Sequence, residues 1–315
     1  MEIVRRLGDL KPDAPYVATI GKFDGLHRGH QYLIELTKRR AAERGARSAV
    51  ITFDPHPLLV LRPGQPFKQL ICFSDKVKLI GTLGVDLLAI ITFTPQVAAQ
   101  TPAEFMTWLR QHLHLTLLVE GVDFALGKGR AGNPAVLAEI GERLGYRVET
   151  INRLQLDGEE ISSAAIRRHL EAGNVARAGQ LLGRPPAASG PVVEGAKRGR
   201  QLGVPTANLA VPEELLLPAN GVYAAVATSP ELPRAYPAMA NIGTRPTFDN
   251  GARTVEAHLL DFDGDLYGTL LTLHFIDRLR DEQRFNGVEA LVAQLERDRR
   301  ATAARVTDAV LRGVR

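Results

Sequence analysis

The sequence of 315 residues lacks several features that mark whole classes of protein. It holds a single cysteine, Cys72, so no disulfide can form within the chain, which fits a reducing compartment. It has no run of about 18 consecutive apolar residues, and no apolar signal core follows the charged residues at its start. We therefore expect a cytoplasmic protein with no membrane partner.

An excess of charge of one sign is also missing. The 39 basic and 35 acidic residues leave a formal net charge of +4, which is small for a chain of this length. We therefore expect no nucleic-acid partner, whereas small anionic ligands such as nucleotides fit the slight basic excess. The oligomeric state leaves no signature in the sequence.

Two familiar nucleotide-binding patterns are absent or misplaced. No segment matches G-x-x-x-x-G-K-[ST], so a kinase formed by this chain is not a P-loop enzyme. Residues 127–132 match G-x-G-x-x-G, but residues 121–126 separate them from the preceding predicted strand, and a helix starts only after Asn133. We interpret the segment as a flexible basic loop whose Lys128 and Arg130 contact phosphates, which argues against a hydride-transfer enzyme.

The sequence has ordinary globular composition and a length typical of about two domains. In the first half, Val-, Ile- and Leu-rich segments alternate with helical patterns, which is typical of a parallel α/β sheet covered on both faces. The expected strands are 16–20, 49–53, 86–93 and 115–120, and the expected helices are about 29–44, 75–83 and 102–114. Two short helices broken at Gly173 are expected over 163–182.

The pattern of the sequence changes after Leu182. Short segments of alternating apolar and polar residues follow, with frequent Gly and Pro, which predicts an all-β barrel or sandwich. The expected strands are 192–195, 222–228, 238–242, 254–262 and 269–276, followed by a closing helix over about 288–311. We therefore predict an α/β domain over residues 1–183 and a β domain over residues 184–315.

Residues 19–30 lie where the first predicted strand ends and the first helix begins, a usual ligand position in a parallel α/β sheet. Gly21 and Gly25 let backbone N–H groups approach a phosphate, and the helix start adds further N–H donors and partial positive charge. His27 and His30 are three residues apart and can face the same side. We predict that they donate hydrogen bonds to a triphosphate and stabilise charge as pyrophosphate leaves.

A metal-dependent hydrolase is an alternative for the same segment. Asp24, His27, His30, Asp54 and His56 are all potential metal ligands, and such clusters activate water. The nucleotide interpretation is favoured because the three glycines of residues 21–30 have a function around phosphates and none at a metal site.

Two further segments carry candidate phosphate-binding residues. His56 follows the second predicted strand, whose carboxyl end shares an edge of the sheet with the first, and the neighbouring prolines are turn formers. Ser162, Ser163 and Arg167 open the first of the two short helices, and we assign them to phosphate binding. For the two serines a plain helix N-cap is the alternative.

The second half contains a basic, glycine-rich loop over residues 195–203 that leads into Thr206 and Asn208. Lys197 and Arg200 supply positive charge for a polyphosphate. Thr206 and Asn208 point the same way if the chain is extended, and their oxygens suit Mg²⁺. Taken alone the pattern is weak, because a basic loop is usually a solvated surface.

Four motifs of the first half resemble the nucleotidyltransferase half of bacterial bifunctional riboflavin kinase/FAD synthetases. They are G-x-F-D-G-x-H-x-G-H at 21–30, D-P-H-P at 54–57, G-x-D-F-x-x-G at 121–127 and S-S-x-x-I-R at 162–167. The resemblance implies a Rossmann-like nucleotidyltransferase domain that transfers AMP from ATP to FMN. It also implies that Phe23, Asp24 and Asp123 help to bind ATP and that Phe124 contacts the flavin. The family usually has Thr where this chain has Ala164.

The second half is similar to the riboflavin kinase half of the same family. The shared motifs are R-G-R-x-L-G-x-P-T-A-N at 198–208, N-I-G-T-R-P-T-F at 241–248, V-E-A-H at 255–258, L-Y-G at 266–268 and L-R-D-E-Q-R-F at 279–285. The resemblance implies a small β-barrel with a C-terminal helix, in which Thr206 and Asn208 bind Mg²⁺ and Glu256 takes the proton of the riboflavin hydroxyl. It implies further that Arg280 and Phe285 help to hold the flavin.

We therefore predict an enzyme that phosphorylates riboflavin with ATP to FMN and then adenylylates FMN to FAD. One alternative is a riboflavin kinase with a weak first domain, because Ala164 lacks the usual hydroxyl. Another is a flavin- or nucleotide-binding regulator without catalysis that also binds nucleic acid through its basic last helix.

Overall fold

The computed structural model describes residues 1–10, 14–195, 204–244 and 253–314. They form two compact units, Met1–Ile161 and Ser162–Arg315. Packing therefore groups the two helices that follow Ile161 with the second unit, although the composition changes only after them, near Gly183.

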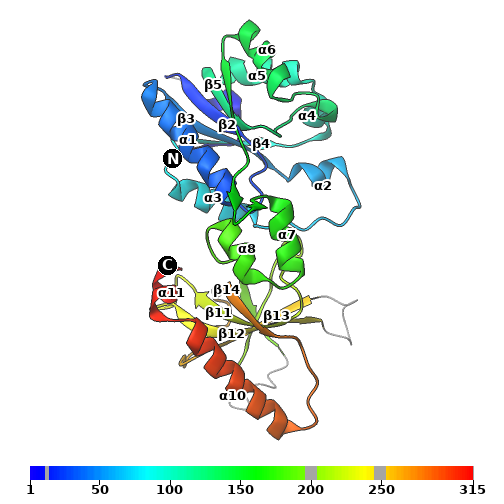
Figure 1. Ribbon diagram of the computed structural model, residues 1–315, viewed down its shortest axis with the longest axis vertical. Coiled ribbons are helices and arrows are strands. Elements are labelled where there is room, and N and C mark those ends of the chain that lie inside the picture. Colours follow the sequence, from blue (N-terminus) through cyan, green and yellow to red (C-terminus); the bar gives the residue numbers. More distant parts are fainter. Residues whose placement is uncertain (11–13, 196–203, 245–252, 315) are drawn as a thin grey trace. The chain divides into compact units, whose positions relative to one another are not determined.

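The first unit is built on a six-stranded parallel sheet with helices on both faces (Figure 1). Its strands are β1 (Glu2–Val4), β2 (Tyr16–Ile20), β3 (Arg47–Asp54), β4 (Leu87–Thr92), β5 (Leu115–Gly121) and β6 (Arg147–Ile151). The strand order is β1-β4-β3-β2-β5-β6, so the direction of winding reverses between β2 and β5. Open α/β sheets bind their ligands at such a switch point.

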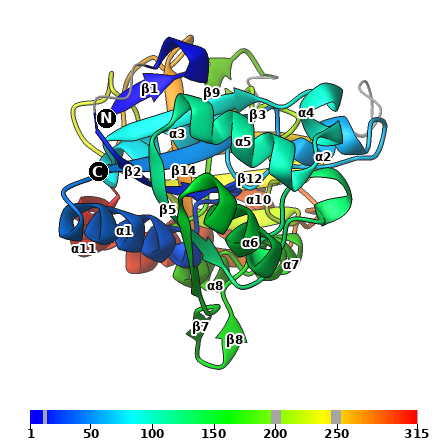
Figure 2. The same ribbon diagram turned by 90° about the horizontal axis from the view of Figure 1, so that it is seen from above.

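Two apolar clusters fix the helices to the sheet. One cluster packs α1 (Arg28–Glu43) and α3 (Phe73–Thr82) on one face, and the other packs α5 (Pro102–His112) and α6 (Pro134–Leu144) on the opposite face. The central strands are buried along nearly their whole length, which explains their continuous Val, Ile and Leu content. The unit is completed by η1 (Leu7–Asp9), α2 (Pro57–Leu61), α4 (Pro95–Ala99), η2 (Lys128–Arg130) and the β7 (Gln155–Leu156)–β8 (Glu159–Glu160) hairpin, which projects from it in Figure 2.

The second unit is a closed antiparallel barrel of six strands, in the order β10-β13-β12-β11-β14-β9. The strands are β9 (Ala187–Val193), β10 (Ala207–Leu209), β11 (Gly221–Thr228), β12 (Tyr236–Thr244), β13 (Arg253–Leu259) and β14 (Leu270–Arg280). Alternate residues of β13 are buried, so its remaining side chains, Glu256 among them, lie on the outer surface.

Among the described residues, four helices accompany the barrel: α7 (Ser163–Glu171), α8 (Val175–Leu182), α10 (Val288–Arg305) and α11 (Asp308–Gly313). The last two were expected as one helix over 288–311, and this expectation is wrong. Val306 leaves helical geometry and is buried in an apolar cluster with Ala224 and Val226, so the chain turns inward before α11 begins.

The predicted fold class, a parallel α/β sheet followed by a β-barrel with a C-terminal helix, is confirmed. Strand β9 begins at Ala187, well before the expected start at Val192, because Gly190 and Pro191 resemble a loop in the sequence. A Cβ at Gly190 would collide with the carbonyl group of Ala210, so glycine here permits close strand packing inside β9. Across the described residues, every helix is too short or too polar to cross a membrane.

His274 makes the stability of the barrel pH-dependent. Its Nε2 lies 3.0 Å from Thr228 Oγ1, and burial, followed by the charge of Arg184, lowers the pKa of His274 to about 4. Because the folded pKa lies below the ordinary value of about 6.5, the neutral ring stabilises the fold above pH 6.5, and that stability is lost as the pH falls toward 4.

We expect acidification from pH 7 to 4 to cost the wild-type chain roughly 3 kcal/mol more unfolding free energy than it costs His274→Gln. Glutamine does not titrate and can still bond to Thr228. Urea unfolding at several pH values measures the difference, and identical acid slopes for the two chains would contradict this assignment.

Candidate active sites

The end of β2 is held at the switch point by a buried carboxyl group. The N–H of Ile20 donates to Glu120 Oε1 at 2.6 Å, just where β5 stops pairing with β2. Glu120 is 1% exposed, and burial raises its pKa well above the usual range. Glu120 was not predicted as a site residue, because its only signal in the sequence is one acid within the apolar strand LTLLVEG.

The turn that follows β2 is strongly bent. The N–H of Gly21 donates to the Ile51 carbonyl at 2.9 Å, and Phe23, Gly25 and Leu26 all have left-handed backbone angles with φ of 49°, 79° and 41°. Such angles are costly for Phe and Leu, and they concentrate at functional sites. A Cβ at Gly21 would lie only 2.9 Å from the Phe23 ring, so Gly21 lets this ring fold over the backbone.

The two histidines come together as predicted. His27 is the N-cap of α1 and accepts a hydrogen bond at Nδ1 from the His30 N–H at 3.4 Å. Their rings stack with centroids 3.6 Å apart. Because Nδ1 of His27 is an acceptor, the neutral ring carries its proton on Nε2, which can donate to an anion.

Asp24 and His56 have structural partners in the same unit. Asp24 is buried and accepts at Oδ1 from the Leu70 N–H at 2.8 Å. His56 is the N-cap of α2, where its Nδ1 accepts from Leu58 N–H at 3.2 Å, and its ring stacks on Phe67. Because Nδ1 of His56 is also an acceptor, its neutral ring carries the proton on Nε2, which is then its donor.

The basic loop is not a dinucleotide-binding turn, in agreement with the sequence interpretation. Lys128 and Arg130 lie on the short 3-10 helix η2 and are exposed. A Cβ at either Gly127 or Gly132 would come within 2.8 Å of Pro102, so these glycines serve close packing. The pKa of Lys22 is lowered, first by lost hydration and then by the charge of Arg130, which places the loop's charge near the turn after β2.

Asp123 and Phe124 occupy the segment between β5 and the basic loop. Asp123 forms an ion pair with Arg153, which also binds Glu160 of the β7–β8 hairpin. Phe124 packs against the apolar core of the unit. The assignments of Asp123 to ATP and of Phe124 to flavin stay predictions.

Ser162, Ser163 and Arg167 belong to the second compact unit by packing. Ser162 is the N-cap of α7 and accepts from the Ala165 N–H at 3.2 Å, so it has the helix-capping role that was the alternative to phosphate binding. Ala164 is exposed on the first turn of α7. The assignment of the two serines and of Arg167 to phosphate binding stays a prediction.

The alternative metal site finds no support in the geometry. Within the part of the chain that the structure describes, no three His, Cys, Asp or Glu side chains are grouped so that they could hold a metal ion. Asp54 instead pairs with Arg5 at 3.3 Å.

In the barrel, three polar residues form a row across neighbouring strands. Glu256 on β13 lies directly opposite Asn208 on β10 and opposite Asn241 on β12. Directly opposed residues share a face of the sheet, so all three side chains leave the barrel on its outer side. Glu256 and Asn208 were predicted as site residues from the sequence, whereas Asn241 was not, although it lies within the motif at 241–248.

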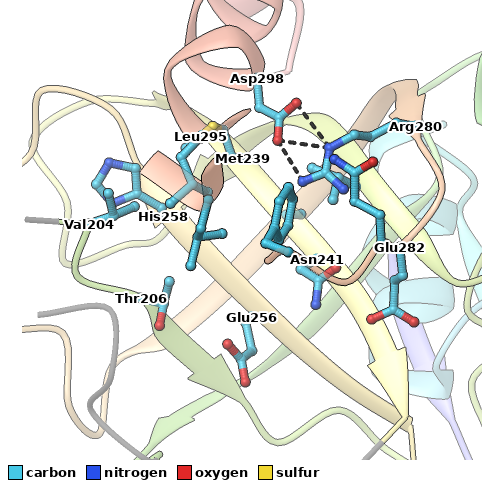
Figure 3. Close-up of a pocket in the computed structure, with 15 residues that line it drawn as sticks. Val204, Thr206, Met239, Asn241, Glu256, His258, Arg280, Glu282, Leu295 and Asp298 are labelled. Carbon is cyan, nitrogen blue, oxygen red and sulfur yellow. Dashed lines mark hydrogen bonds and ion pairs between the residues drawn. The ribbon is translucent and has the colours of Figure 1, made fainter. Parts of the chain in front are cut away.

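A cavity of about 280 Å³ lies at this row, between the barrel surface and α10. Figure 3 shows Thr206 and Glu256 at one end of it and Arg280 with Asp298 at the other. Its apolar lining consists of Val204, Val222, Met239, Ala240, Phe285, Leu291 and Leu295. An apolar slot with a few polar groups at its ends suits a flat ring system with a polar tail.

His258 holds in place the end of the cavity where Thr206 and Glu256 lie. Its Nδ1–H donates to the Pro205 carbonyl at 2.8 Å, which ties the segment before β10 to the outer face of β13. Thr206 is thereby kept on the same side as Glu256. Lys197 and Arg200, predicted to bind the polyphosphate, lie outside the described residues.

At the other end, Arg280 connects the barrel to α10. Its Nε and Nη2 bind the Asp298 carboxylate at 3.0 and 2.7 Å, and Asp298, 3% exposed, also accepts from Gln294 at 2.8 Å. The guanidinium carbon lies 5.7 Å from the centre of the Phe285 ring. The ion pair thus fixes both α10 and the ring-binding end of the cavity.

We expect Asp298→Asn to lower the free energy of unfolding of the barrel by roughly 3 kcal/mol, because it leaves the Arg280 charge in a half-buried place without its partner. The double variant Arg280→Met/Asp298→Leu, which removes both charges, should lose less. Urea unfolding measures both. Equal stability of Asp298→Asn and the wild-type chain would show that the pair does not hold α10.

Comparisons with known proteins agree with the geometry of both units. A family model described as FAD synthetase matches residues 10–165, and one described as riboflavin kinase matches residues 182–306. A relative from Listeria monocytogenes named bifunctional riboflavin kinase/FMN adenylyltransferase is 38% identical over 93% of this chain and 93% of its own length. Relatives of the same name from Pseudomonas fluorescens and Escherichia coli K12 are 38% and 36% identical over 96% and 95% of this chain, and over 97% and 96% of their own lengths.

A solved structure is similar over almost the whole chain. It has a TM-score of 0.87 and 31% identity, and the match covers 95% of this chain and 97% of that one. It is named as a macrolide-efflux protein from Streptococcus pneumoniae, a different activity from that in the names of the curated relatives. The two family models agree with the curated names.

Proposed function

The chain belongs to the bifunctional riboflavin kinase/FMN adenylyltransferase family, and from this premise we propose which of its residues carry out each reaction. The second unit phosphorylates riboflavin with ATP to give FMN. The first unit transfers AMP from ATP to FMN, giving FAD and pyrophosphate. The riboflavin kinase model matches residues 182–306, which lie in the second unit. The FAD synthetase model matches residues 10–165, almost all of which lie in the first unit.

In the kinase step, the terminal hydroxyl of riboflavin attacks the γ-phosphorus of ATP and ADP leaves. A primary alcohol needs a positioned proton acceptor, and Glu256 supplies a carboxylate between Asn208 and Asn241. The flavin ring occupies the apolar slot beside Phe285 and Arg280, which leaves its ribityl chain directed toward Glu256. This cross-strand row at the end of an apolar slot is the observation that supports the proposal most strongly.

Thr206 and Asn208 fit Mg²⁺. They offer hydroxyl and amide oxygens beside a carboxylate, and this ion prefers such hard oxygen donors. When bound, the ion neutralises charge on the β- and γ-phosphates of ATP. A Cβ at Gly195 would collide with the Asn208 amide, so this glycine leaves the amide the space that it needs.

In the adenylylation step, a phosphate oxygen of FMN attacks the α-phosphorus of ATP, and the bond to pyrophosphate breaks without a covalent enzyme intermediate. The N–H groups of the bent turn and the Nε2–H groups of His27 and His56 are donors for the triphosphate. His30, stacked on His27, is a further donor for the triphosphate and holds the His27 ring in place. Lys128 and Arg130 add positive charge from the basic loop.

The proposal is tested by incubating the chain with riboflavin, ATP and Mg²⁺ and separating the flavins by chromatography. We expect FMN to form first and FAD to follow. In a parallel reaction FMN replaces riboflavin and should give FAD directly. If no FMN forms from riboflavin, the kinase assignment is wrong, and if FMN gives no FAD, the assignment of the first unit is wrong.

A further inference from the structure

A buried lysine lies beneath the turn that follows β2. Lys76, on α3, is 3% exposed, although lysine is almost never buried to this extent without a partner. Its Nζ donates to the Lys22 carbonyl at 3.2 Å and lies 3.5 Å from Thr52 Oγ1 and 4.9 Å from the centre of the Phe73 ring. None of the roles assigned to the first unit so far uses this ammonium group.

Lys76 and Thr52 together set the direction of two successive peptide groups. Thr52 Oγ1 donates to the Gly21 carbonyl at 3.0 Å, and Lys76 donates to the next carbonyl, that of Lys22. A trans peptide directs its C=O and N–H to opposite sides. Because both carbonyls are bound from the buried side, the N–H groups of Lys22 and Phe23 point away from it.

The charges around Lys76 favour its protonated form but do not remove the cost of burial. Asp24 of the turn and Asp54 at the end of β3 both raise its pKa, whereas burial has the larger effect and lowers the pKa to about 8. Asp54 also pairs with Arg5, whose guanidinium lies over the Phe73 ring. At pH 7 the amine is therefore mostly charged, and it loses its charge as the pH rises past about 8.

We propose that Lys76 is a positioning residue for adenylylation, which holds the Lys22 carbonyl inward so that the N–H groups of Lys22 and Phe23 face the triphosphate of ATP. The inference rests on the proposed function of the first unit. Lys76 itself lies behind the turn and acts on the nucleotide through the backbone.

The test compares Lys76→Met and Lys76→Arg with Lys78→Met, a matched control. Lys78 is on the same helix, with 71% of its side chain exposed, and makes a surface pair with Asp75. We expect Lys76→Met to lower kcat/KM for ATP in FAD formation from FMN at least tenfold at pH 7, with KM for FMN changed less than twofold. Lys76→Arg should restore most of the rate, and Lys78→Met should behave as the wild type.

The pH profile gives a second readout, which a merely structural lysine would not move. FAD formation by the wild-type chain should fall as the pH rises past about 8, whereas Lys76→Arg should lack this fall because arginine stays charged. If Lys76→Met does not fold, this comparison of the wild type with Lys76→Arg decides.

Two results would overturn the inference: folded Lys76→Met with wild-type kcat/KM for ATP, or the same alkaline fall in the wild type and Lys76→Arg. A wild-type chain that makes no FAD from FMN would instead contradict the proposed function. The two failures are therefore distinguishable.

Discussion

Replacing Glu256 with glutamine is expected to lower the rate of FMN formation by about 10²–10⁴-fold, the usual contribution of a general base. Glutamine keeps the size of the side chain and its place between Asn208 and Asn241, but it cannot take the proton of the riboflavin hydroxyl. FAD formation from added FMN should stay within about twofold of the wild type, because that reaction is assigned to the other unit. Initial rates with riboflavin and with FMN measure both effects in one preparation.

The control is Glu231→Gln, which makes the same chemical change at an exposed position between β11 and β12. It should leave both rates unchanged. Riboflavin binding, followed by the flavin's fluorescence, should persist in Glu256→Gln, since the carboxylate lies at the end of the cavity away from Arg280. A Glu256→Gln chain that phosphorylates riboflavin at the wild-type rate would show that another group accepts the proton.

His30→Ala should have the reverse effect and reduce FAD formation from FMN by about 10²–10³-fold, the loss typical of one preorganised donor in a reaction of this kind. The variant removes the ring stacked on His27 and frees that ring to turn. It keeps the backbone N–H that His27 caps, so α1 should still begin at the same place. FMN formation from riboflavin should be unchanged.

His114→Ala is the matched control for the first unit. His114 is exposed and directly precedes β5. Because β5 runs parallel to β2, His114 lies at the end of the strands opposite to the one where β2 ends. Both of its rates should equal those of the wild type. A His30→Ala chain that loses both activities equally while remaining folded would contradict the division of the two reactions between the units.

Much of the fold could be predicted from the sequence because its signals are local. The buried strands β2 to β5 are continuous Val-, Ile- and Leu-rich runs, and Thr101 and Asn133 mark helix starts as side-chain caps. Elements whose form depends on distant partners were harder to predict. Gly190 in β9 resembles a loop residue until the neighbouring strand is seen, and the break after Arg305 depends on the barrel residues that receive Val306.

The same distinction applies to the sites. Motif residues such as His27, His30 and Glu256 could be placed from the sequence, since each follows or lies within a recognisable strand. Glu120, Lys76 and Asp298 could not, because a charged residue in a sequence normally indicates a solvated surface. Only the three-dimensional contacts show that each is buried and bonded to a group at a site: the Ile20 N–H, the Lys22 carbonyl and the Arg280 guanidinium, respectively.

The transfer of labelled phosphorus tests the central claim most directly, because the two units are assigned different phosphorus atoms of ATP. With riboflavin as the acceptor, ATP labelled at the γ-phosphorus should give labelled FMN, and FAD that retains this label. With FMN as the acceptor, ATP labelled at the α-phosphorus should give labelled FAD, and γ-labelled ATP should give none. FAD that gains no α-label from ATP, or FMN that gains no γ-label, would contradict the account.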